Sequence, residues 1–435
     1  MNISPNHLTS RRDFLKTSAL AGGVLAAPAI LPGSLFAKEN SDTLRVGLVG
    51  CGGRGSGAAD QALTADKNVI LTAMADAFED RLQTSLKNLR TKHPEKVQVT
   101  PEKCFVGLDS YQKLIDSGVD VVLLTTPPGF RPVHLRAAIE AGKHVFTEKP
   151  VATDAPGIRS VLETAEKAKQ KSLSLVAGFC YRYNDGVRAI MQKIHDGAIG
   201  DVKALYTVYN TGSIWSPFPR KPDWTDMQYQ VKNWYYYTWL SGDHIVEQAV
   251  HSIDKMAWVM KDEPPVKCVA LGGRQVRTAP EFGNIFDHFS VVYDYANGAR
   301  GFHNCRQQAG CAGDNSDYFM GADGVAHIVR SFSGPFVIKG KNAWKFREEK
   351  PTDMYQNEHN EFFASIRKGE PINDGIRMAN STLTAIMGRM AAYTGQDITW
   401  EQAMNSKETI VPADMNWNAP ISVAPVAMPG LTKFA

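Results

Sequence analysis

Val46-Gly47-Leu48-Val49-Gly50-Cys51-Gly52-Gly53-Arg54-Gly55 is the stretch of sequence that decides the fold class. The apolar run 44–49 predicts a buried strand, a G-x-G-x-x-G pattern follows it, and residues 56–65 continue as a helix. We expect Gly50 to permit a tight turn, Gly52 to let the backbone approach a pyrophosphate, and Gly55 to let the helix pack closely on the strand. The helix N-terminus would present free N–H groups to the phosphates. The stretch therefore predicts a strand–loop–helix unit that binds a dinucleotide.

Asp76 and Arg81 bear on which dinucleotide binds. Asp76 ends the next predicted strand, 21 residues after Gly55. An acid at this position accepts hydrogen bonds from both ribose hydroxyls and repels a 2′-phosphate, which predicts NAD. Arg81 lies near enough in the sequence to keep NADP as an alternative.

Short apolar runs alternate with helical runs from residue 41 to residue 178. Strands are expected at 44–49, 69–75, 119–125, 144–147 and 173–177, with helices at 78–89, 132–141 and 155–169. Strands that alternate with helices of this length are typical of a parallel sheet covered on both faces. We therefore predict an NAD-binding Rossmann domain, a doubly wound parallel sheet, over residues 41–178.

The pattern changes after residue 178. Runs at 202–209, 268–276, 289–295 and 299–304 alternate with a period of two, and Asn297-Gly298 between the last two is a strong hairpin signal. Helices are expected at 355–368 and 376–393, ended by Gly369 and Gly395. The second half is thus predicted to be an α/β domain with a large open, mostly antiparallel sheet over residues 179–400, followed by an extended arm over 401–435.

The composition is typical of a soluble globular chain. Hydrophobic residues make up 43% of the 435 residues and charged residues 21%, which excludes a disordered or fibrous chain. The net charge of +3, from 48 basic and 45 acidic residues, gives no electrostatic case for nucleic acid. The six cysteines show no metal-like spacing, so free thiols are expected, with a Cys305–Cys311 bond as the alternative.

Residues 1–37 are interpreted as an export signal. Arg11-Arg12 precede an apolar run, 19–30, that is too short to span a membrane, which takes about 20 residues. This pattern is typical of a twin-arginine signal peptide, and cleavage is expected after Ala29 or Ala37. The alternative is a chance arginine pair before a buried segment. No other run is long and apolar enough for a membrane span, so the sequence predicts a periplasmic protein.

Three further runs carry the chemistry. Thr125-Thr126-Pro127-Pro128 ends the predicted strand 119–125, with His134 in the helix after it, and Glu148-Lys149-Pro150 follows the predicted strand 144–147. The third run contains Glu247-Gln248-Ala249-Val250-His251. Together with the glycine loop and the turn Gly321-Ala322-Asp323-Gly324, these motifs resemble the Gfo/Idh/MocA family of sugar and cyclitol oxidoreductases over residues 43–400.

The resemblance implies a fold and a set of roles. The second domain's sheet would line the substrate cleft and make an oligomer interface, which implies a homo-oligomer, a dimer or tetramer. Lys149 matches the lysine beside the nicotinamide and the reacting hydroxyl, Glu148 matches the acid before it, and His251 matches the catalytic histidine. Glu247 stands where the family usually has Asp, so its carboxylate reaches one methylene further.

The residue types support the same roles. Glu247, His251 and Asp254 are spaced to share one helix face, so we expect the Glu247 carboxylate to orient the histidine and raise its basicity. We expect His251 to take the hydroxyl proton and Lys149 to polarise the same oxygen; the alternatives are a core histidine and a surface lysine. Although His244, Glu247 and His251 invite a metal interpretation, H-x-x-E-x-x-x-H is not a known zinc signature, so no metal is expected.

The predicted site falls into three groups of residues. The predicted catalytic residues are Lys149, His251 and Glu247. The predicted cofactor-binding residues are Gly50, Gly52, Gly53, Arg54, Gly55, Asp76, Arg81, Thr126, Pro127, His134, Glu148 and Lys149. The predicted substrate-binding residues are Arg182, Tyr183, Trp234, Tyr236, Asp243, His244 and His251. Aromatic faces suit sugar rings, and the family often places an arginine after the sixth strand.

The leading interpretation is a periplasmic NAD-dependent oxidoreductase that oxidises a hydroxyl of a sugar, glycoside or cyclitol to a ketone. Because little free NAD exists outside the cytoplasm, the cofactor is expected to stay bound and to be reoxidised by a second sugar or an external electron acceptor. One alternative is a glycoside hydrolase that uses NAD for transient oxidation and elimination. Exported enzymes of that kind share Gly53-Arg54-Gly55, but they carry Y-P-T-H where this chain has Gln248-Ala249-Val250-His251. Another alternative is a non-catalytic sugar-binding or sensing module.

Overall fold

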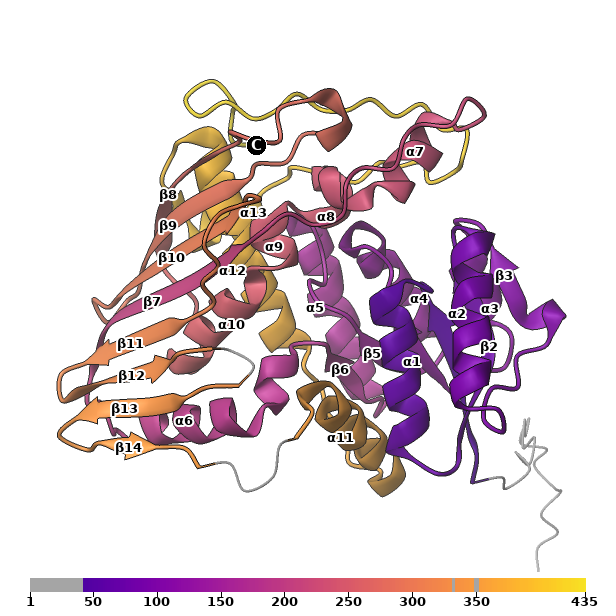
Figure 1. The fold of residues 1–435 in the computed structure, drawn as a ribbon, viewed down its shortest axis with the longest axis horizontal. Coiled ribbons are helices and arrows are strands. Elements are labelled where there is room, and N and C mark those ends of the chain that lie inside the picture. Colours follow the sequence, from indigo (N-terminus) through magenta and orange to yellow (C-terminus); the bar gives the residue numbers. More distant parts are fainter. Residues whose placement is uncertain (1–41, 331–332, 348–351) are drawn as a thin grey trace, which may run out of the picture. The chain divides into compact units, whose positions relative to one another are not determined.

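Two sheets carry all the strands β1–β15 in the described part of the chain, which comprises residues 42–330, 333–347 and 352–435 of this computed structural model (Figure 1). The predicted export signal, residues 1–37, lies outside the described residues. The first sheet, sheet A, is built from the N-terminal half, and the second, sheet B, from the C-terminal half.

Sheet A has six strands, and all its neighbours pair in parallel in the order β3-β2-β1-β4-β5-β6. Its strands are β1 (Leu44–Val49), β2 (Val69–Asp76), β3 (Cys104–Val106), β4 (Val121–Leu124), β5 (His144–Thr147) and β6 (Leu175–Ala177). The strand order reverses between β1 and β4. In a doubly wound sheet, ligands bind at the carboxyl ends of the strands at this switch point.

Helices cover both faces of sheet A, which explains why its strands are continuous apolar runs and do not alternate. Val46 and Leu48 pack against one group of helices, whereas Val49 packs on the opposite face. The first group comprises α1 (Gly53–Ala65), α2 (Glu79–Lys92) and α11 (Met354–Lys368). The opposite face is covered by α3 (Ser110–Ile115), α4 (Arg131–Glu140) and α5 (Ala155–Gln170).

Sheet B has nine strands in the order β14-β13-β12-β11-β7-β10-β9-β8-β15. They are β7 (Val202–Thr211), β8 (Lys267–Gly273), β9 (His288–Asp294), β10 (Arg300–Gln307), β11 (Asp317–Gly321), β12 (Gly324–Ile328), β13 (Phe336–Gly340), β14 (Trp344–Lys345) and β15 (Ile398–Thr399). Strands β7 and β10 pair in parallel, and the other neighbours are antiparallel. The predicted fold class, a Rossmann domain followed by an α/β domain with an open, mostly antiparallel sheet, is confirmed.

In the described part of the chain, helices pack on one face of sheet B and leave the other face without helices (Figure 1). This group includes α6 (Asp185–His195), α10 (Val250–Val259) and α12 (Gly375–Thr394). On the other face Leu271 of β8 is 78% exposed, and Val269 and Phe302 are also exposed. The remaining helices are α7 (Asp226–Lys232), α8 (Thr238–Ser241), α9 (His244–Glu247) and α13 (Trp400–Asn405).

The predicted turns and helix ends are present. Gly298 has φ +83° in the hairpin between β9 and β10, and Gly369 and Gly395 end α11 and α12 with φ +67° and +71°. Helix α11, by contrast, lies elsewhere than the sequence suggests. It packs on sheet A through Phe362 and Phe363, although it follows sheet B in the chain.

The chain after α13 forms neither helix nor strand from residue 406 to residue 435. Its start is fixed by Ile410, whose N–H donates to the Asp154 carboxylate at 3.1 Å. No helix among the described residues is long and apolar enough to cross a membrane. All six cysteines are free thiols, as expected, and Cys305 is buried whereas Cys311 is exposed.

Candidate active site

The glycine loop between β1 and α1 has the close contacts that its spacing predicts. Gly50 adopts φ +97°, and a Cβ added there would lie 2.8 Å from the Thr126 backbone nitrogen. A Cβ at Gly55 would lie 1.9 Å from the carbonyl oxygen of Gly50, so only glycine lets α1 start this close to β1. At Gly53, by contrast, an added Cβ meets nothing within 4 Å. The loop is tight toward the protein and open on the side where a ligand would lie.

Asp76 fixes the backbone around this loop. Its Oδ2 accepts the Cys51 N–H at 2.6 Å, and its Oδ1 accepts the Phe78 N–H at 2.9 Å. Burial of the carboxylate raises the pKa of Asp76, although these two amides and the charge of Arg81 oppose the shift. Arg81 also lies at the site, with its Nη1 3.7 Å from where a Cβ on Gly52 would be.

A cavity of about 530 Å³ lies at the carboxyl ends of the sheet A strands and extends to residues of the second half. The predicted site residues that line it are Gly50, Gly52, Gly53, Arg54, Gly55, Asp76, Arg81, Thr126, Pro127, His134, Glu148, Lys149, Trp234, Glu247 and His251. All predicted cofactor-binding and catalytic residues are therefore brought together in one cavity.

Two observations indicate that the cavity can hold a dinucleotide. The open space beside Gly53 is a cradle that any larger side chain would fill. In addition, α1 begins with Gly52 as its N-cap and has no side-chain cap, so its first N–H groups are free to bind a phosphate. Residues 50–55 would therefore hold the pyrophosphate, and Asp76 would face the ribose.

Arg54 joins the glycine loop to the Glu148-Lys149-Pro150 motif. Its Nε donates to Glu148 Oε1 at 2.6 Å, and its guanidinium lies 4.7 Å from the ring centroid of Tyr355 on α11. Beneath it, Glu358 is fully buried, and neither of its carboxylate oxygens has a hydrogen-bond partner among the described residues. Burial and the charge of Glu148 raise the pKa of Glu358 well above its ordinary value, although the charge of Arg54, whose Nη2 lies 3.8 Å from the carboxylate, opposes the shift. Helix α11 thus completes the wall behind the loop.

Arg131 holds two of the motifs in place, and sequence reasoning missed it. Its guanidinium donates to the carbonyl oxygens of Thr126 and Pro150, which ties the loop after β4 to the loop after β5. Next to it, His134 stacks on Tyr111 with ring centroids 4.0 Å apart. Burial and the Arg131 charge lower the pKa of His134 to about 3, so its imidazole is neutral.

Lys149 and Glu247 form a pair across the two halves of the chain. Lys149 Nζ donates to the Glu247 carbonyl at 2.6 Å and to its carboxylate at 3.2 Å. Both side chains are largely buried, at 12% and 13% exposure. The ammonium group of Lys149 has three N–H donors, and within the described residues two of them are used in these hydrogen bonds. One donor is therefore left for a ligand.

His251 lies on the same wall but is not oriented by Glu247, contrary to our prediction. The chain bends between α9 and α10, and the Glu247 carboxylate pairs with Lys149. The edge of the imidazole instead meets Tyr181, with centroids 5.0 Å apart, and its Nδ1 is buried with no hydrogen-bond partner among the described residues. Burial, with the charges of Lys149 and Lys255, lowers the pKa of His251 well below its ordinary value.

Arg182 and Tyr183 do not line the cavity, although we predicted substrate contacts for both. Arg182 is 4% exposed, and its guanidinium pairs with Asp254 at 2.9 Å and with Asp262 at 2.5 Å. The N–H groups of the Arg182 guanidinium therefore bind carboxylates inside the protein. Tyr183 is buried in the core against sheet A and stacks with Arg188.

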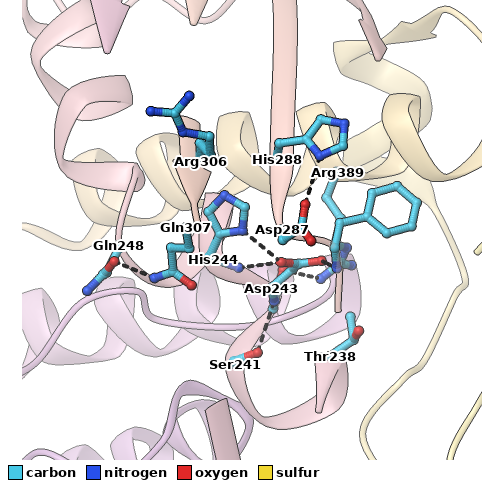
Figure 2. A network of polar contacts seen from close by, with 12 residues as sticks. Thr238, Ser241, Asp243, His244, Gln248, Asp287, His288, Arg306, Gln307 and Arg389 are labelled. Atoms are coloured by element: carbon cyan, nitrogen blue, oxygen red, sulfur yellow. Dashed lines mark hydrogen bonds and ion pairs between the residues drawn. The ribbon is translucent and has the colours of Figure 1, made fainter. Parts of the chain in front are cut away.

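Asp243, His244 and Tyr236 do not line the cavity either, although we predicted substrate contacts for them, and each has an internal partner. Asp243 has φ +74°, and its carboxylate accepts the N–H group of His244 at 2.5 Å (Figure 2). It also accepts the N–H group of Phe286 at 2.7 Å. The His244 imidazole is buried next to Asp243. The Tyr236 hydroxyl donates to the carbonyl of Trp215. These residues shape the second half of the chain and do not face a ligand.

Other cavity residues escaped sequence reasoning altogether. They are Phe78, Tyr209, Gln248 and Tyr355, together with several backbone and apolar positions. Tyr209 lies on β7 and Tyr355 on α11, so only the tertiary fold brings them to the glycine loop. Gln248 stands between Glu247 and His251, and this position was the available signal. No group of three or more metal-ligating side chains occurs within residues 42–330, 333–347 and 352–435.

Two family models match the chain. Residues 44–175 match the oxidoreductase family with an NAD-binding Rossmann fold, and residues 187–327 match the GFO/IDH/MocA C-terminal domain. Among curated relatives, the inositol 2-dehydrogenase of Rhizobium meliloti is 25% identical over 344 residues, which is 77% of this chain and 93% of that protein. A glycosyl hydrolase family 109 protein of Saccharopolyspora erythraea is 28% identical over 210 residues, 44% of each chain.

Solved structures share the fold. Levoglucosan dehydrogenase in complex with NADH and levoglucosan superposes with a TM-score of 0.64 at 18% identity, over 82% of this chain and 99% of that one. The aldose-aldose oxidoreductase from Caulobacter crescentus, complexed with glycerol, has a TM-score of 0.64 at 17% identity, with the same shares. The two family models match the parts of the chain that form sheet A and most of sheet B. The chain therefore belongs to the Gfo/Idh/MocA oxidoreductase family, with an NAD-binding Rossmann domain at residues 44–175.

Proposed function

We propose that the protein oxidises a hydroxyl group of a sugar, glycoside or cyclitol to a ketone with NAD as the oxidant. The observation that carries the proposal is the meeting of Lys149 and His251 in the cavity that the glycine loop lines. One comes from the loop after β5 and the other from α10, so the fold brings a cation and a neutral imidazole together beside a dinucleotide site.

The two side chains suit the proton that leaves an alcohol. When bound, NAD would accept the hydride from the carbon that carries the hydroxyl. Because the lowered pKa keeps His251 neutral, its imidazole can accept the hydroxyl proton at neutral pH. Lys149 donates its remaining N–H to the same oxygen and stabilises the negative charge that develops there. Glu247 holds the ammonium group in place.

The test is to add sugars to the NAD-loaded protein and follow the absorbance of reduced nicotinamide. The panel contains D-glucose, D-galactose, methyl glycosides, 1,6-anhydroglucose and myo-inositol. We expect reduction with at least one member, and the keto product is then identified by mass spectrometry. Binding of sugars without any spectral change across the panel would favour the non-catalytic binding module.

We further propose that NAD stays bound over many turnovers. Phe78 lines the cavity next to Asp76, and two segments from the second half cover it. The Trp417 ring of the C-terminal arm lies 5.7 Å from the Phe78 ring, and Lys232 of α7 lies 4.5 Å above it. Lys232 also pairs with Asp80 of α2 at 2.8 Å. These contacts support slow dissociation, because they must open before the adenosine end can leave.

Retention is tested by purifying the protein without nucleotide, denaturing it and measuring the dinucleotide released. We expect close to one NAD per chain and ping-pong kinetics, in which a second sugar or an external acceptor reoxidises the bound cofactor. Trp417→Ala should release NAD several times faster, whereas Met428→Ala, an exposed position of the same arm, should not. Protein that is isolated empty and saturates with added NAD would refute retention.

The periplasmic location and the oligomeric state are also proposals. Arg11-Arg12 and the apolar run 19–30 support export by the twin-arginine route. Exposed Val269, Leu271 and Phe302 on the free face of sheet B support a homo-oligomer, because monomers rarely expose neighbouring large apolar side chains.

A second candidate activity, glycoside hydrolysis by transient oxidation, is favoured by the similarity to the glycosyl hydrolase family 109 protein. Gly53-Arg54-Gly55 in the loop also favours it. Release of the aglycone from a nitrophenyl glycoside, without net reduced nicotinamide, would support hydrolysis over dehydrogenation.

A further inference from the structure

A relay of buried polar side chains leads from the core of the second half to the cavity wall. Gln248 lines the cavity, and its Oε1 accepts a hydrogen bond from Gln307 Nε2 at 2.6 Å (Figure 2). Gln307 lies on β10 and is 1% exposed. Its Oε1 accepts from Arg277 Nη1 at 2.9 Å, and its Nε2 also donates to the Tyr235 hydroxyl at 2.7 Å.

The arginine fixes the direction of every bond in this relay. A guanidinium can only donate, so the Gln307 oxygen must face Arg277 and the Gln307 amide nitrogen must face Gln248. The Gln248 oxygen must in turn face Gln307, because the flipped amide would set two donors against each other. The Nε2 amide group of Gln248, which is a donor, is therefore the end of the side chain that does not bind Gln307, and its orientation does not depend on a ligand.

The arginine is itself held rigidly. Arg277 is 5% exposed, and its Nη2 donates to the Phe286 carbonyl at 2.8 Å. The turn that carries it is closed by Asp287, whose carboxylate accepts the N–H groups of Gln275 and Val276 at 2.7 and 2.8 Å. Gln307 is fixed to the same place, since its N–H donates to the Asp287 carbonyl at 2.9 Å. The relay thus starts from a rigid cation.

Within the described residues, Gln248 Nε2 has no hydrogen-bond partner, and Glu247 and His251 line the cavity on either side of Gln248 in the chain. We propose that Gln248 Nε2 is a fixed hydrogen-bond donor to a substrate oxygen adjacent to the carbon that is oxidised, and that Arg277 and Gln307 set this polarity. The inference rests on the proposed oxidation of a carbohydrate hydroxyl. It makes Gln248 a specificity-determining residue, which accepts a hydroxyl or ether oxygen and rejects a deoxy or ammonium position.

Two variants reverse the polarity by different routes. Gln248→Glu keeps an oxygen toward Gln307 and places a second acceptor in the cavity. Gln307→Glu changes nothing that lines the cavity: its carboxylate accepts from Arg277 and from Gln248, so the Gln248 amide turns and presents its oxygen. Gln98→Glu, on an exposed Gln whose partner is a backbone carbonyl, is the matched control.

The experiment compares kcat and KM for single-position deoxy, deoxyfluoro and amino analogues of the panel sugar that is oxidised fastest. Fluorine accepts a hydrogen bond but cannot donate one, hydrogen does neither, and an ammonium group only donates. With the wild-type protein we expect the deoxyfluoro analogue at one position to exceed the deoxy analogue about 3- to 10-fold in kcat/KM, mostly through KM. Both Glu variants should abolish that advantage and improve the amino analogue relative to the parent, and the Gln98→Glu control should do neither.

The outcomes separate the two proposals. A wild-type protein that oxidises no sugar of the panel overturns the proposed function and the inference with it. A wild-type protein that oxidises sugars, but shows no such position, overturns the inference alone, as does an unchanged analogue profile in both variants. If thermal denaturation shows that Gln307→Glu does not fold, the Gln248→Glu variant, at a half-buried position, still tests the inference.

Discussion

His251 is the residue on which the chemistry depends most. Burial and two nearby lysine charges lower the pKa of its imidazole, so the folded protein keeps it neutral to lower pH than an ordinary histidine. A base must be unprotonated to act, so the acid limb of kcat/KM should lie below about pH 6.5, the ordinary histidine pKa. A pH series with NAD-loaded protein measures it, with circular dichroism at each pH as the control for unfolding. An acid limb at or above that pH would contradict the neutral-base role.

Asp76 is expected to set the choice between NAD and NADP. Asp76→Asn retains an oxygen for the Cys51 amide but removes the negative charge that would repel a 2′-phosphate. We expect the NADP affinity to rise relative to that of NAD, with a smaller loss of NAD affinity itself, in binding titrations of nucleotide-free protein. Asp60→Asn removes a carboxylate of α1 that pairs with Lys92, outside the cavity, and should leave the ratio unchanged.

At this scale, sequence reasoning succeeded where function is encoded in local motifs and failed where it depends on partners far along the chain. The glycine loop, Lys149 and His251 all reach the cavity, because each lies in a short motif beside a strand or helix end. Arg182 has the same local signature, but Asp254, 72 residues away, pairs with it inside the core. Arg131, Arg277 and Gln307 carry no local pattern at all, and Gln248 is marked only by its position between Glu247 and His251.

At the scale of elements, two glycines at the junction of β1 and α1 should have different roles, Gly55 in stability and Gly53 in ligand binding. Gly55→Ala would place a methyl group 1.9 Å from the Gly50 carbonyl, so we expect a stability loss of about 1–3 kcal/mol and weaker NAD binding. Gly53→Ala meets no atom, and a helical Gly→Ala change of this kind stabilises by about 0.4–1 kcal/mol, but its methyl would occupy the ligand's space. Thermal denaturation and NAD titration of both variants test this, and equal losses of stability would refute it.

The elements themselves were largely predictable, and their packing was not. Apolar runs and the Asn297-Gly298 turn predicted the strands of sheet A other than β3 and the β9–β10 hairpin, because periodicity and turn chemistry are local properties. The same periodicity predicts α11 but does not reveal which sheet it covers. Phe362 and Phe363 form part of the apolar face of α11. An apolar helix face of this kind could pack against either sheet.

For the whole molecule, we propose that NAD binds before the twin-arginine signal directs the folded chain to the periplasm. Replacing Arg11 and Arg12 by lysine should leave the chain in the cytoplasm with NAD bound, whereas the unchanged protein should reach the periplasm with NAD bound. Cell fractionation followed by dinucleotide analysis of each pool measures both properties. Equal distribution of the two proteins between compartments would contradict export by the twin-arginine route.

The most direct test of the central claim is the reduction of bound NAD by sugar, compared between the wild-type protein, Lys149→Met and His251→Gln. General acid–base groups contribute about 10²–10⁴-fold, so each variant should lose turnover on that scale while keeping its NAD content. His251→Gln should also keep the melting temperature, whereas Lys149→Met should lower it, because the largely buried Glu247 carboxylate loses its cation. Lys87→Met, on an exposed face of α2, is the control and should retain wild-type turnover. We expect reduced nicotinamide to form with at least one sugar and to be lost in both site variants. Wild-type turnover in either variant, or no reduction by any sugar, would contradict it.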